Sequence, residues 1–395
     1  MKSFVSSLLL LSFLVPDLFS QSFKTIGYLP DYRFSLIDRI NLDQLTHLNI
    51  AFANPDMDGN LSTGGQDIAN IVDKAHSQGV QVYISLAGAV LSSAEELAWK
   101  ELLKPQNRAG FISSILSYVH TYGLEGMDVD LEWSHVDENY SGFILEMRDS
   151  VDQTDLGLTA ALPGHYRYPQ ISDAALQAFD WINMMVYDLT GPWAPQNPGH
   201  HSTYAHATEA MNYWTDQGVD ARNLTLGVPF YGYDFSNLNN IIARTYGEMV
   251  AIDPEYADRD EVNEMYYNGL STIQAKTELA LTHLSGIMIW EIGQDDFGDY
   301  SLLNRIWETV ELALPAASFE HDISLKVYPN PFQDHLEISL DDRSKAILRL
   351  YDLNGRLIQE WIASKPMPVD HLRAGSYLLE VISEKGRSTR KLIKQ

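Results

Sequence analysis

Short apolar runs rich in β-branched residues alternate with amphipathic stretches along most of the chain. The amphipathic stretches, at helical spacing, are 67–77, 107–122, 140–151, 205–217, 272–284 and 302–314. The β-rich runs are 25–28, 47–53, 81–86, 127–131, 158–162, 182–187, 225–229 and 286–290. Because strands that alternate with helices form parallel sheets, the pattern predicts an α/β fold. Eight such strands in about 290 residues favour a (β/α)8 TIM barrel over an open doubly wound sheet. No G-x-G-x-x-G follows the first strand, which weakens the dinucleotide-binding alternative.

Three carboxylates occupy alternate positions at the fourth predicted strand, in the sequence Glu-Gly-Met-Asp-Val-Asp-Leu-Glu-Trp of 125–133. Strand side chains alternate between two faces, so Asp128, Asp130 and Glu132 face the barrel interior about 6.5 Å apart. Burial and mutual repulsion raise the pKa of at least one of them. Glu132, the outermost, is then suited to protonate a glycosidic oxygen. A solvated acidic strand edge and a carboxylate metal site are the alternatives, although no loop of ion-binding spacing accompanies the strand.

Composition and charge exclude several classes of protein. The 395 residues are 45% hydrophobic and 20% charged, which is typical of a globular chain and not of a disordered one. The net charge of −26 would repel a polyanion, so no nucleic-acid partner is expected. The absence of Cys excludes disulfides and Cys-ligated metal sites. We expect neither a metal nor a cofactor.

The first residues resemble a secretory signal peptide. A lysine at position 2 precedes an apolar run over 4–15 that is too short to span a bilayer, and a small residue, Ser20, marks the expected cleavage site. A buried first helix is the alternative. No later run reaches about 18 apolar residues. We therefore expect 1–20 to be removed and the mature protein to have no membrane segment.

The charge changes sign near the C-terminus. Residues 1–322 carry 15 basic and 44 acidic side chains, whereas residues 323–395 carry 12 and 9. The predicted organisation is a barrel domain over 21–314, a linker over 315–322 and a second domain over 323–395. Six short β-rich runs and the hairpin signal Asn354-Gly355 predict a small β-sandwich in the second domain.

The barrel region resembles glycoside hydrolase family 18, the chitinase family, over about residues 24–312. The family pattern D-G-x-D-x-D-x-E matches at 125–132, except that Glu125 stands where Asp is usual. Ala87 replaces a usual Gly, and Tyr233 stands where many relatives have Arg. Further matches, each on the appropriate strand and in the appropriate order, are 48–53, 85–88, 185–188, 226–232 and Trp290.

The resemblance implies a role for each catalytic position. Glu132 would be the general acid and then the general base, and Asp130 would hold and polarise the substrate N-acetyl group. Asp128 would share a proton or a hydrogen bond with Asp130, and Tyr187 would hydrogen-bond the acetamido oxygen. The reaction would be retaining, with the substrate's own acetamido oxygen as the nucleophile. The residues implied to bind the sugar are Trp290, Tyr28, Phe52, Asp188, Met185 and Trp133.

The resemblance also implies a carbohydrate ligand, and it leaves two alternative functions open. The expected ligand is chitin or an N-acetylglucosamine oligosaccharide, bound by a monomer that cuts internal bonds. An endo-β-N-acetylglucosaminidase acting on N-glycans is the alternative enzyme, and a lectin with a dead site is the non-enzyme alternative, which the presence of Glu132 disfavours. Only 231–285 separates the seventh and eighth strands, so we expect no α+β module there and an open groove. The adjacent His200 and His201 are expected at the surface.

The C-terminal segment resembles the sorting domain of the type IX secretion system. The residues that carry this resemblance are 327–332, 350–356, 375–378 and the basic tail 391–394. The resemblance implies that the type IX machinery recognises 323–395 and that the protein is secreted, either free or at the cell surface. A carbohydrate-binding module is the alternative, but Trp361 is its single obvious Trp candidate.

Overall fold

The chain forms two compact units that divide between Val310 and Glu311. The computed structural model describes residues 23–152, 154–313, 326–333, 336–339, 346–351, 357–362, 369, 372–373, 375–383 and 386–394. The predicted signal peptide (1–20) and linker (315–322) lie outside these described residues.

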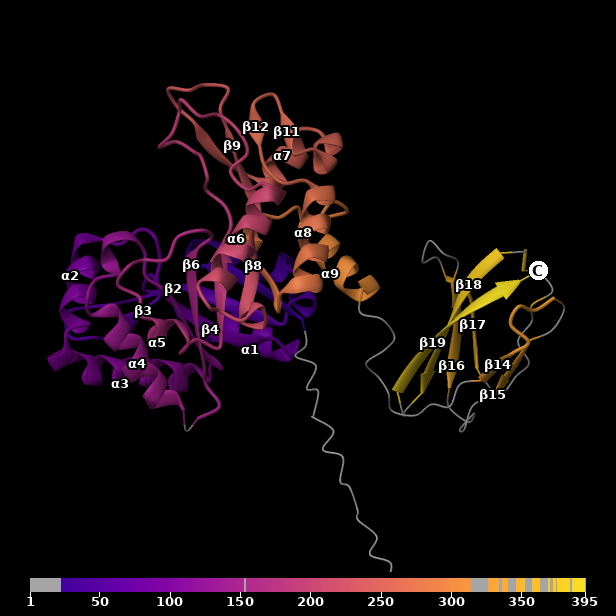
Figure 1. Ribbon diagram of the computed structural model, residues 1–395, viewed down its shortest axis with the longest axis horizontal. Helices are drawn as coiled ribbons and strands as arrows, with labels where there is room; N and C mark the ends of the chain where they lie inside the picture. Colours follow the sequence, from indigo (N-terminus) through magenta and orange to yellow (C-terminus); the bar gives the residue numbers. More distant parts are fainter. Residues whose placement is uncertain are drawn as a thin grey trace, which may run out of the picture. The chain divides into compact units, whose positions relative to one another are not determined.

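Eight parallel strands form a closed barrel in the first unit (Figure 1). Their order is β1-β13-β8-β7-β6-β5-β4-β2, and pairing between β1 and β2 closes the ring. The predicted TIM barrel is therefore confirmed. A two-residue strand, β3 (Leu61–Ser62), pairs antiparallel with the end of β2. The barrel strands are β1 (Lys24–Pro30), β2 (His47–Pro55), β4 (Gln81–Ala87), β5 (Gly126–Asp130), β6 (Gly157–Pro163), β7 (Trp181–Met185), β8 (Leu224–Pro229) and β13 (Gly286–Trp290).

Helices surround the barrel, and local signals set their ends. Ser92 and Glu95 form a reciprocal capping box at the start of α2, and Gly123 ends α3 with a left-handed φ of 65°. The surrounding helices are α1 (Ala69–Ser77), α2 (Ser93–Leu102), α3 (Pro105–Tyr122), α4 (Tyr140–Val151), α5 (Asp173–Leu176), α6 (Tyr204–Asp216), α8 (Leu270–His283) and α9 (Leu302–Ala313). Short 3-10 turns are η1 (Asp31–Arg39), η2 (Leu42–Gln44), η3 (Trp133–His135), η4 (Ala221–Asn223), η5 (Pro254–Asp258) and η6 (Ile292–Gln294).

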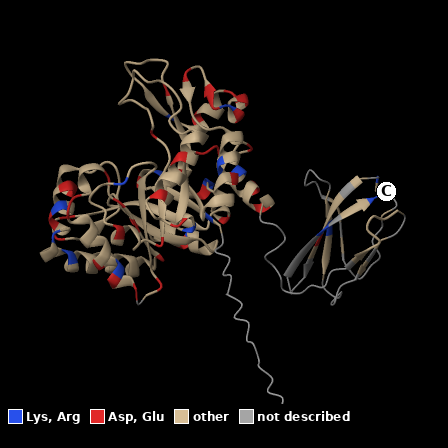
Figure 2. Cartoon of the chain, viewed as in Figure 1, with Lys and Arg blue, Asp and Glu red and all other residues tan. Residues whose placement is uncertain are grey.

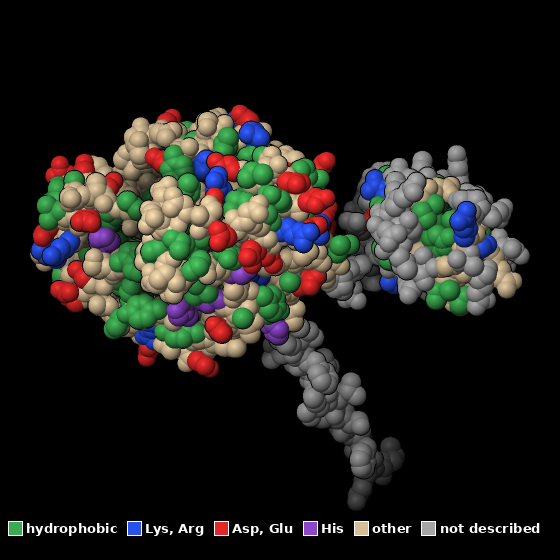
Figure 3. All heavy atoms as spheres, turned by 90° about the horizontal axis from the view of Figure 1, so that it is seen from above, with side chains coloured by type: hydrophobic (Ala, Val, Ile, Leu, Met, Phe, Trp, Pro, Cys, Tyr) green, Lys and Arg blue, Asp and Glu red, His purple; other side chains and the backbone are tan. Residues whose placement is uncertain are grey.

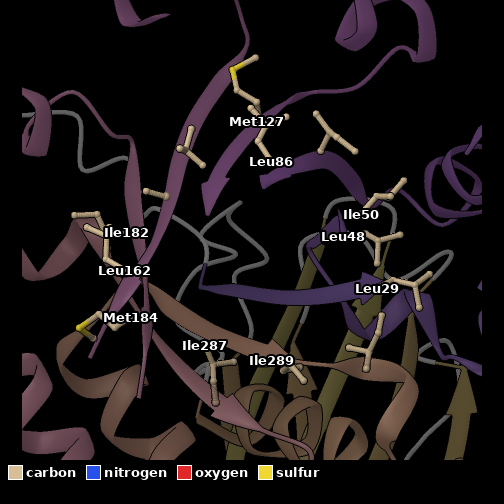
Figure 4. Close-up of a cluster of buried hydrophobic side chains, with 14 of the residues drawn as sticks. Leu29, Leu48, Ile50, Leu86, Met127, Leu162, Ile182, Met184, Ile287 and Ile289 are labelled. Atoms are coloured by element: carbon tan, nitrogen blue, oxygen red, sulfur yellow. The ribbon is translucent and has the colours of Figure 1, made fainter. Parts of the chain in front are cut away.

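The main hydrophobic core lies between the strands and these helices. Alternate strand residues such as Leu48, Ile50 and Met127 supply it (Figure 4). Burial of each such side chain contributes roughly 1.5–3 kcal/mol. On the fourth barrel strand, β5, the apolar residues belong to this core, whereas Asp128 and Asp130 are also buried but do not belong to it. The predicted alternation of the two faces is therefore confirmed.

A small α+β module occupies the segment between β8 and β13, so the expectation that none is present was wrong. It follows the C-terminal end of β8, and its four strands pair antiparallel in the order β10-β9-β12-β11 (Figure 1). Tyr231 and Tyr233 of the first strand and Phe235, directly after it, form a small core with Trp290 of the barrel. The very short strands carry too little pattern to be recognised in the sequence. The module comprises β9 (Tyr231–Asp234), β10 (Ile242–Thr245), α7 (Tyr246–Ile252), β11 (Glu261–Val262) and β12 (Met265–Tyr266).

The second unit consists of antiparallel strands, as the six β-rich runs predict. One sheet is the pair β14-β15 and the other has the order β17-β16-β18-β19. Both sheets contribute to one hydrophobic cluster, which contains Leu348, Leu350 and Val381 with Val327 and Ile338 packed against it. The strands are β14 (Lys326–Tyr328), β15 (Glu337–Ser339), β16 (Ile347–Tyr351), β17 (Leu357–Ile362), β18 (Gly375–Ser383) and β19 (Gly386–Lys394).

Acidic side chains are scattered over the helices and loops of the first unit (Figures 2 and 3). This distribution accounts for the negative charge without a single acidic patch on the face that Figure 3 shows. Within the described residues, no helix combines the length and the apolar character needed to cross a bilayer.

Candidate active site

A pocket of about 410 Å³ opens at the C-terminal ends of the barrel strands, where the sequence places its polar and aromatic residues. It brings together nearly all of the predicted site residues. Asp128 does not reach the pocket surface and lies beneath it, fully buried. The predicted residues that line the pocket are Tyr28, Phe52, Asp130, Glu132, Trp133, Met185, Tyr187, Asp188 and Trp290.

Asp128 is held by hydrogen bonds from four neighbouring side chains. Its Oδ2 accepts from the Tyr28 hydroxyl at 2.7 Å and the Ser85 hydroxyl at 2.8 Å. Its Oδ1 accepts from the Thr159 hydroxyl at 2.6 Å and the Asn183 amide at 3.1 Å. Burial raises the pKa of Asp128, and these four hydrogen bonds oppose that rise. Both oxygens are therefore occupied by groups from other strands.

Asp130 has a polar atom that is buried and unpaired. Its Oδ1 has no hydrogen-bond donor among the described residues. Burial raises the pKa of Asp130 well above its usual value, and the charges of Glu132 and Asp128 raise it further. An unpaired buried oxygen is costly.

Glu132 lies two residues beyond β5, at the start of the turn η3, and its exposed fraction is only 8%. Burial raises its pKa to about 7, and the charge of Asp188 contributes to the rise. At neutral pH about half of the molecules therefore carry a proton there, against about 0.3% for a pKa of 4.5.

Trp133, the residue after Glu132, is 66% exposed and has a left-handed φ of 55°. Its backbone N–H donates to the Tyr168 hydroxyl.

Asp188 lies in the loop after β7, because that strand ends at Met185 and not at Tyr187 as predicted. Its Oδ1 accepts from the Tyr231 hydroxyl at 2.6 Å and the Tyr233 hydroxyl at 3.0 Å. The module between β8 and β13, which the sequence pattern does not reveal, therefore supplies two donors to the site.

His201 also holds the Asp188 loop, and it is 1% exposed, so its expected surface position was wrong. Its Nε2 lies 3.2 Å from the Tyr231 carbonyl oxygen, to which it donates. In the neutral ring, Nδ1 then accepts from the Asp188 backbone N–H at 3.3 Å. His200 is partly exposed, and its ring lies against Tyr266.

Aromatic rings form one wall of the pocket. Trp290 stacks against Phe52 with ring centres 5.6 Å apart, and Tyr28 meets it edge-on at 5.8 Å. The next residue, Glu291, is fully buried and accepts from the Arg33 guanidinium at 2.9 Å, which anchors the end of β13. The broad indole face is suited to pack against a sugar ring.

Two groups of residues around the site were not recognised in the sequence. Asn183 and Thr159 face the barrel interior on β7 and β6, and the period-two rule applied to those strands could have identified them. His201, Tyr231 and Tyr233 become partners of Asp188 only through the folding of the module. Tyr231 lies in the matched segment 226–232 and Tyr233 stands at a position where the sequence departs from the family, but neither signal predicts a bond to Asp188. In the part of the chain that the structure describes, no three His, Asp or Glu side chains are arranged to hold a metal ion.

A closed barrel with a buried file of carboxylates and an aromatic wall at its C-terminal face is the architecture of a glycoside hydrolase. Residues 24–295 match the family model of glycosyl hydrolases family 18, and the chain belongs to this family. Residues 326–395 match the secretion system C-terminal sorting domain, a type IX signal for secretion to the cell surface or the extracellular space.

Solved structures and curated proteins agree with the family. The GH18 chitinase ChiB from the chitin utilization locus of Flavobacterium johnsoniae is 43% identical, with a TM-score of 0.72 over 73% of this chain and 94% of that one. A chitinase from Bacteroides thetaiotaomicron is 27% identical, with a TM-score of 0.64 over 73% and 97% of the two chains. Probable chitinase 10 of Drosophila melanogaster is 26% identical over 250 residues, which span 54% of this chain and 11% of that protein.

Proposed function

We propose that the barrel unit is a chitinase that hydrolyses β-1,4 bonds between N-acetylglucosamine units. One observation carries the proposal: Glu132, nearly buried with a pKa of about 7, lies next to Asp130, whose buried Oδ1 has no partner among the described residues. A half-protonated carboxyl can donate a proton at neutral pH and later accept one. Asp130 also lines the pocket, and its carboxyl would accept the N–H of a bound acetamido group once its side chain turns toward the sugar. The similarity to two bacterial chitinases supports the same substrate.

The mechanism uses the substrate as its nucleophile. Glu132 transfers its proton to the glycosidic oxygen, and the carbon–oxygen bond to the leaving sugar breaks. The acetamido carbonyl oxygen forms a bond to the anomeric carbon, which gives an oxazolinium intermediate. Glu132, now ionised, removes a proton from water, and the water oxygen displaces the acetamido oxygen. Two inversions at one carbon retain the β configuration.

The neighbouring residues orient the acetamido group for this attack. Asp130 accepts its N–H, and the Tyr187 hydroxyl donates to its carbonyl oxygen. Burial raises the pKa of Tyr187 well above its usual value, with the charge of Asp130 as the next cause, so the phenol remains a donor. Asp128, held by four donors, would share a proton or a hydrogen bond with Asp130. Holding the nucleophile in place supplies several kcal/mol by proximity.

The sugar would lie against Trp290, with Tyr28, Phe52, Met185, Asp188 and Trp133 around it, since all of them line the pocket. We propose that the enzyme acts as a monomer without a cofactor. We also propose removal of 1–20 on export, a catalytic domain over 21–314, a linker over 315–322, and recognition of 323–395 by the type IX machinery.

The test supplies purified mature protein with three substrates: hexa-N-acetylchitohexaose, a high-mannose glycoprotein and cellohexaose. We expect cleavage of the chitin oligomer with the β anomer formed first, as seen by NMR during the first turnovers. Glu132→Gln should lower turnover by at least about 10²–10⁴-fold, whereas Glu209→Gln on the exposed face of α6 should not. The lengths of the early products show whether internal bonds are cut.

A first-formed α anomer or rapid hydrolysis of cellohexaose would refute the substrate-assisted mechanism. Cleavage of the glycoprotein without cleavage of the chitin oligomer would instead assign the alternative activity, an endo-β-N-acetylglucosaminidase. Binding of the chitin oligomer without any cleavage would identify a lectin.

A further inference from the structure

A lysine side chain is completely buried behind the active site. Lys276, on α8, has an exposed fraction of 0%, and its Nζ donates to three acceptors. These are the Ser202 carbonyl oxygen at 2.9 Å, the Ser202 hydroxyl at 2.7 Å and the Asn268 Oδ1 at 2.7 Å. The three acceptors match the three N–H groups of an ammonium ion, and none of them is a carboxylate. Burial lowers the pKa of Lys276 to about 7, which shows the cost of a cation at this position.

The acceptors of this lysine belong to the scaffold of the catalytic loop. The Ser202 hydroxyl, which accepts from Lys276, donates in turn to the Val186 carbonyl oxygen at 2.5 Å. The Asn268 amide N–H donates to the Ser202 carbonyl oxygen at 2.8 Å, so Asn268 bridges the lysine and the serine. One connected set of hydrogen bonds therefore runs from α8 to the first residue after β7.

The residues that follow Val186 need such support. Tyr187 and Asp188 lie beyond the end of β7, where no strand ladder fixes the backbone. Asp188 has a φ of 65°, in the left-handed region that costs a non-glycine residue about 1 kcal/mol or more. A further hydrogen bond joins the loop after β7 to the segment 201–202: the Leu189 N–H donates to the His201 carbonyl oxygen at 3.0 Å. Its conformation is thus imposed by the segment 201–202 and by what holds that segment.

We propose that Lys276 is a positioning residue for hydrolysis: through Ser202 it fixes the backbone at Val186 and so aims Tyr187 and Asp188 at the bound sugar. The lysine lies outside the lining of the pocket and acts only through this relay. The inference rests on the proposed hydrolysis of chitin oligomers. A positioning role for Lys276 explains why a lysine is buried on α8, where the other buried residues include Leu270, Ile273 and Leu279.

The test compares Lys276→Met and Ser202→Ala with Lys24→Met, a matched control. Lys24 is the second buried lysine of the described chain, but it lies at the opposite end of the barrel, over the ring of Trp181. Kinetics on hexa-N-acetylchitohexaose are measured at a temperature at which each variant is folded by circular dichroism. We expect kcat of Lys276→Met and Ser202→Ala to fall by about 10–100-fold with KM changed less than about threefold. Lys24→Met should keep kcat within about twofold of wild type.

The double variant should lose no more than the larger single loss, because both substitutions break one relay. Wild-type kcat in Ser202→Ala, or a loss in Lys276→Met no greater than in Lys24→Met, would overturn the inference while the proposed function stands. Failure of the wild type to cleave the oligomer would overturn the proposed function and the inference together. If Lys276→Met does not fold, Ser202→Ala alone tests the relay, since it removes the bond to Val186 and leaves the lysine in place.

Discussion

Replacing Glu132 by Gln is expected to stabilise the barrel unit at alkaline pH, although it removes the proton donor. The folded-state pKa of Glu132 is about 7, raised by burial and by the charge of Asp188 from the ordinary 4.5. Between these two values the folded state holds a proton that the unfolded state has released. The free energy of unfolding therefore falls as the pH rises through this window, and the contribution is fully present only below pH 4.5.

The size of the effect follows from the difference between the two pKa values. A difference of about 2.5 corresponds to about 3 kcal/mol that the wild type loses between pH 4.5 and pH 8. Because Gln cannot ionise, the Glu132→Gln variant does not lose this part of the free energy of unfolding. The charge of Glu132 also raises the pKa of Asp130, so its removal eases the ionisation of that neighbour as well. For a domain of this size, about 3 kcal/mol corresponds to a rise in Tm of about 6 °C.

Calorimetry of the full chain at pH 5 and pH 8 measures the change, with the transition of the barrel unit followed separately from that of the C-terminal unit. The advantage of Glu132→Gln over wild type should be larger at pH 8 than at pH 5. Glu209→Gln is the control, because water solvates that exposed carboxylate in both the folded and unfolded states. An advantage of the same size at both pH values would refute the conclusion that burial keeps Glu132 protonated.

Three further results are expected. Arg33→Met leaves the fully buried Glu291 without its counterion and should lower the free energy of unfolding by about 3 kcal/mol in denaturant titration. The same change at the exposed Arg222 should leave the free energy of unfolding nearly unchanged. Tyr233→Phe removes one hydroxyl donor that offsets the charge of Asp188, so that charge should raise the pKa of Glu132 further and move the alkaline limb of the kcat/KM profile to higher pH; an unchanged limb would contradict that link. Deleting 323–395 should leave hydrolysis of soluble oligomers intact and abolish export in a host with the type IX system, and normal secretion of the truncated chain would exclude a sorting role.

The barrel and its carboxylate file could be predicted from the sequence because both depend on local periods. Alternation along 127–131 places Asp128 and Asp130 on one face of the strand and the apolar residues on the other. Eight β-rich runs separated by helical patterns leave few topologies besides the (β/α)8 barrel. Burial of the file follows from closure of the barrel. The raised pKa of Glu132 could thus be anticipated in direction.

Tertiary structure alone decided how those carboxyls are partnered. Asp128 takes its four donors from residues up to 100 positions away. Asp188 receives hydroxyls from Tyr231 and Tyr233, 43 and 45 residues further along, which only the module between β8 and β13 delivers. A side-chain period depends on the backbone of one segment and can be read along the chain. A hydrogen bond between distant segments depends on the distance that barrel closure and module packing create, and no local pattern encodes that distance.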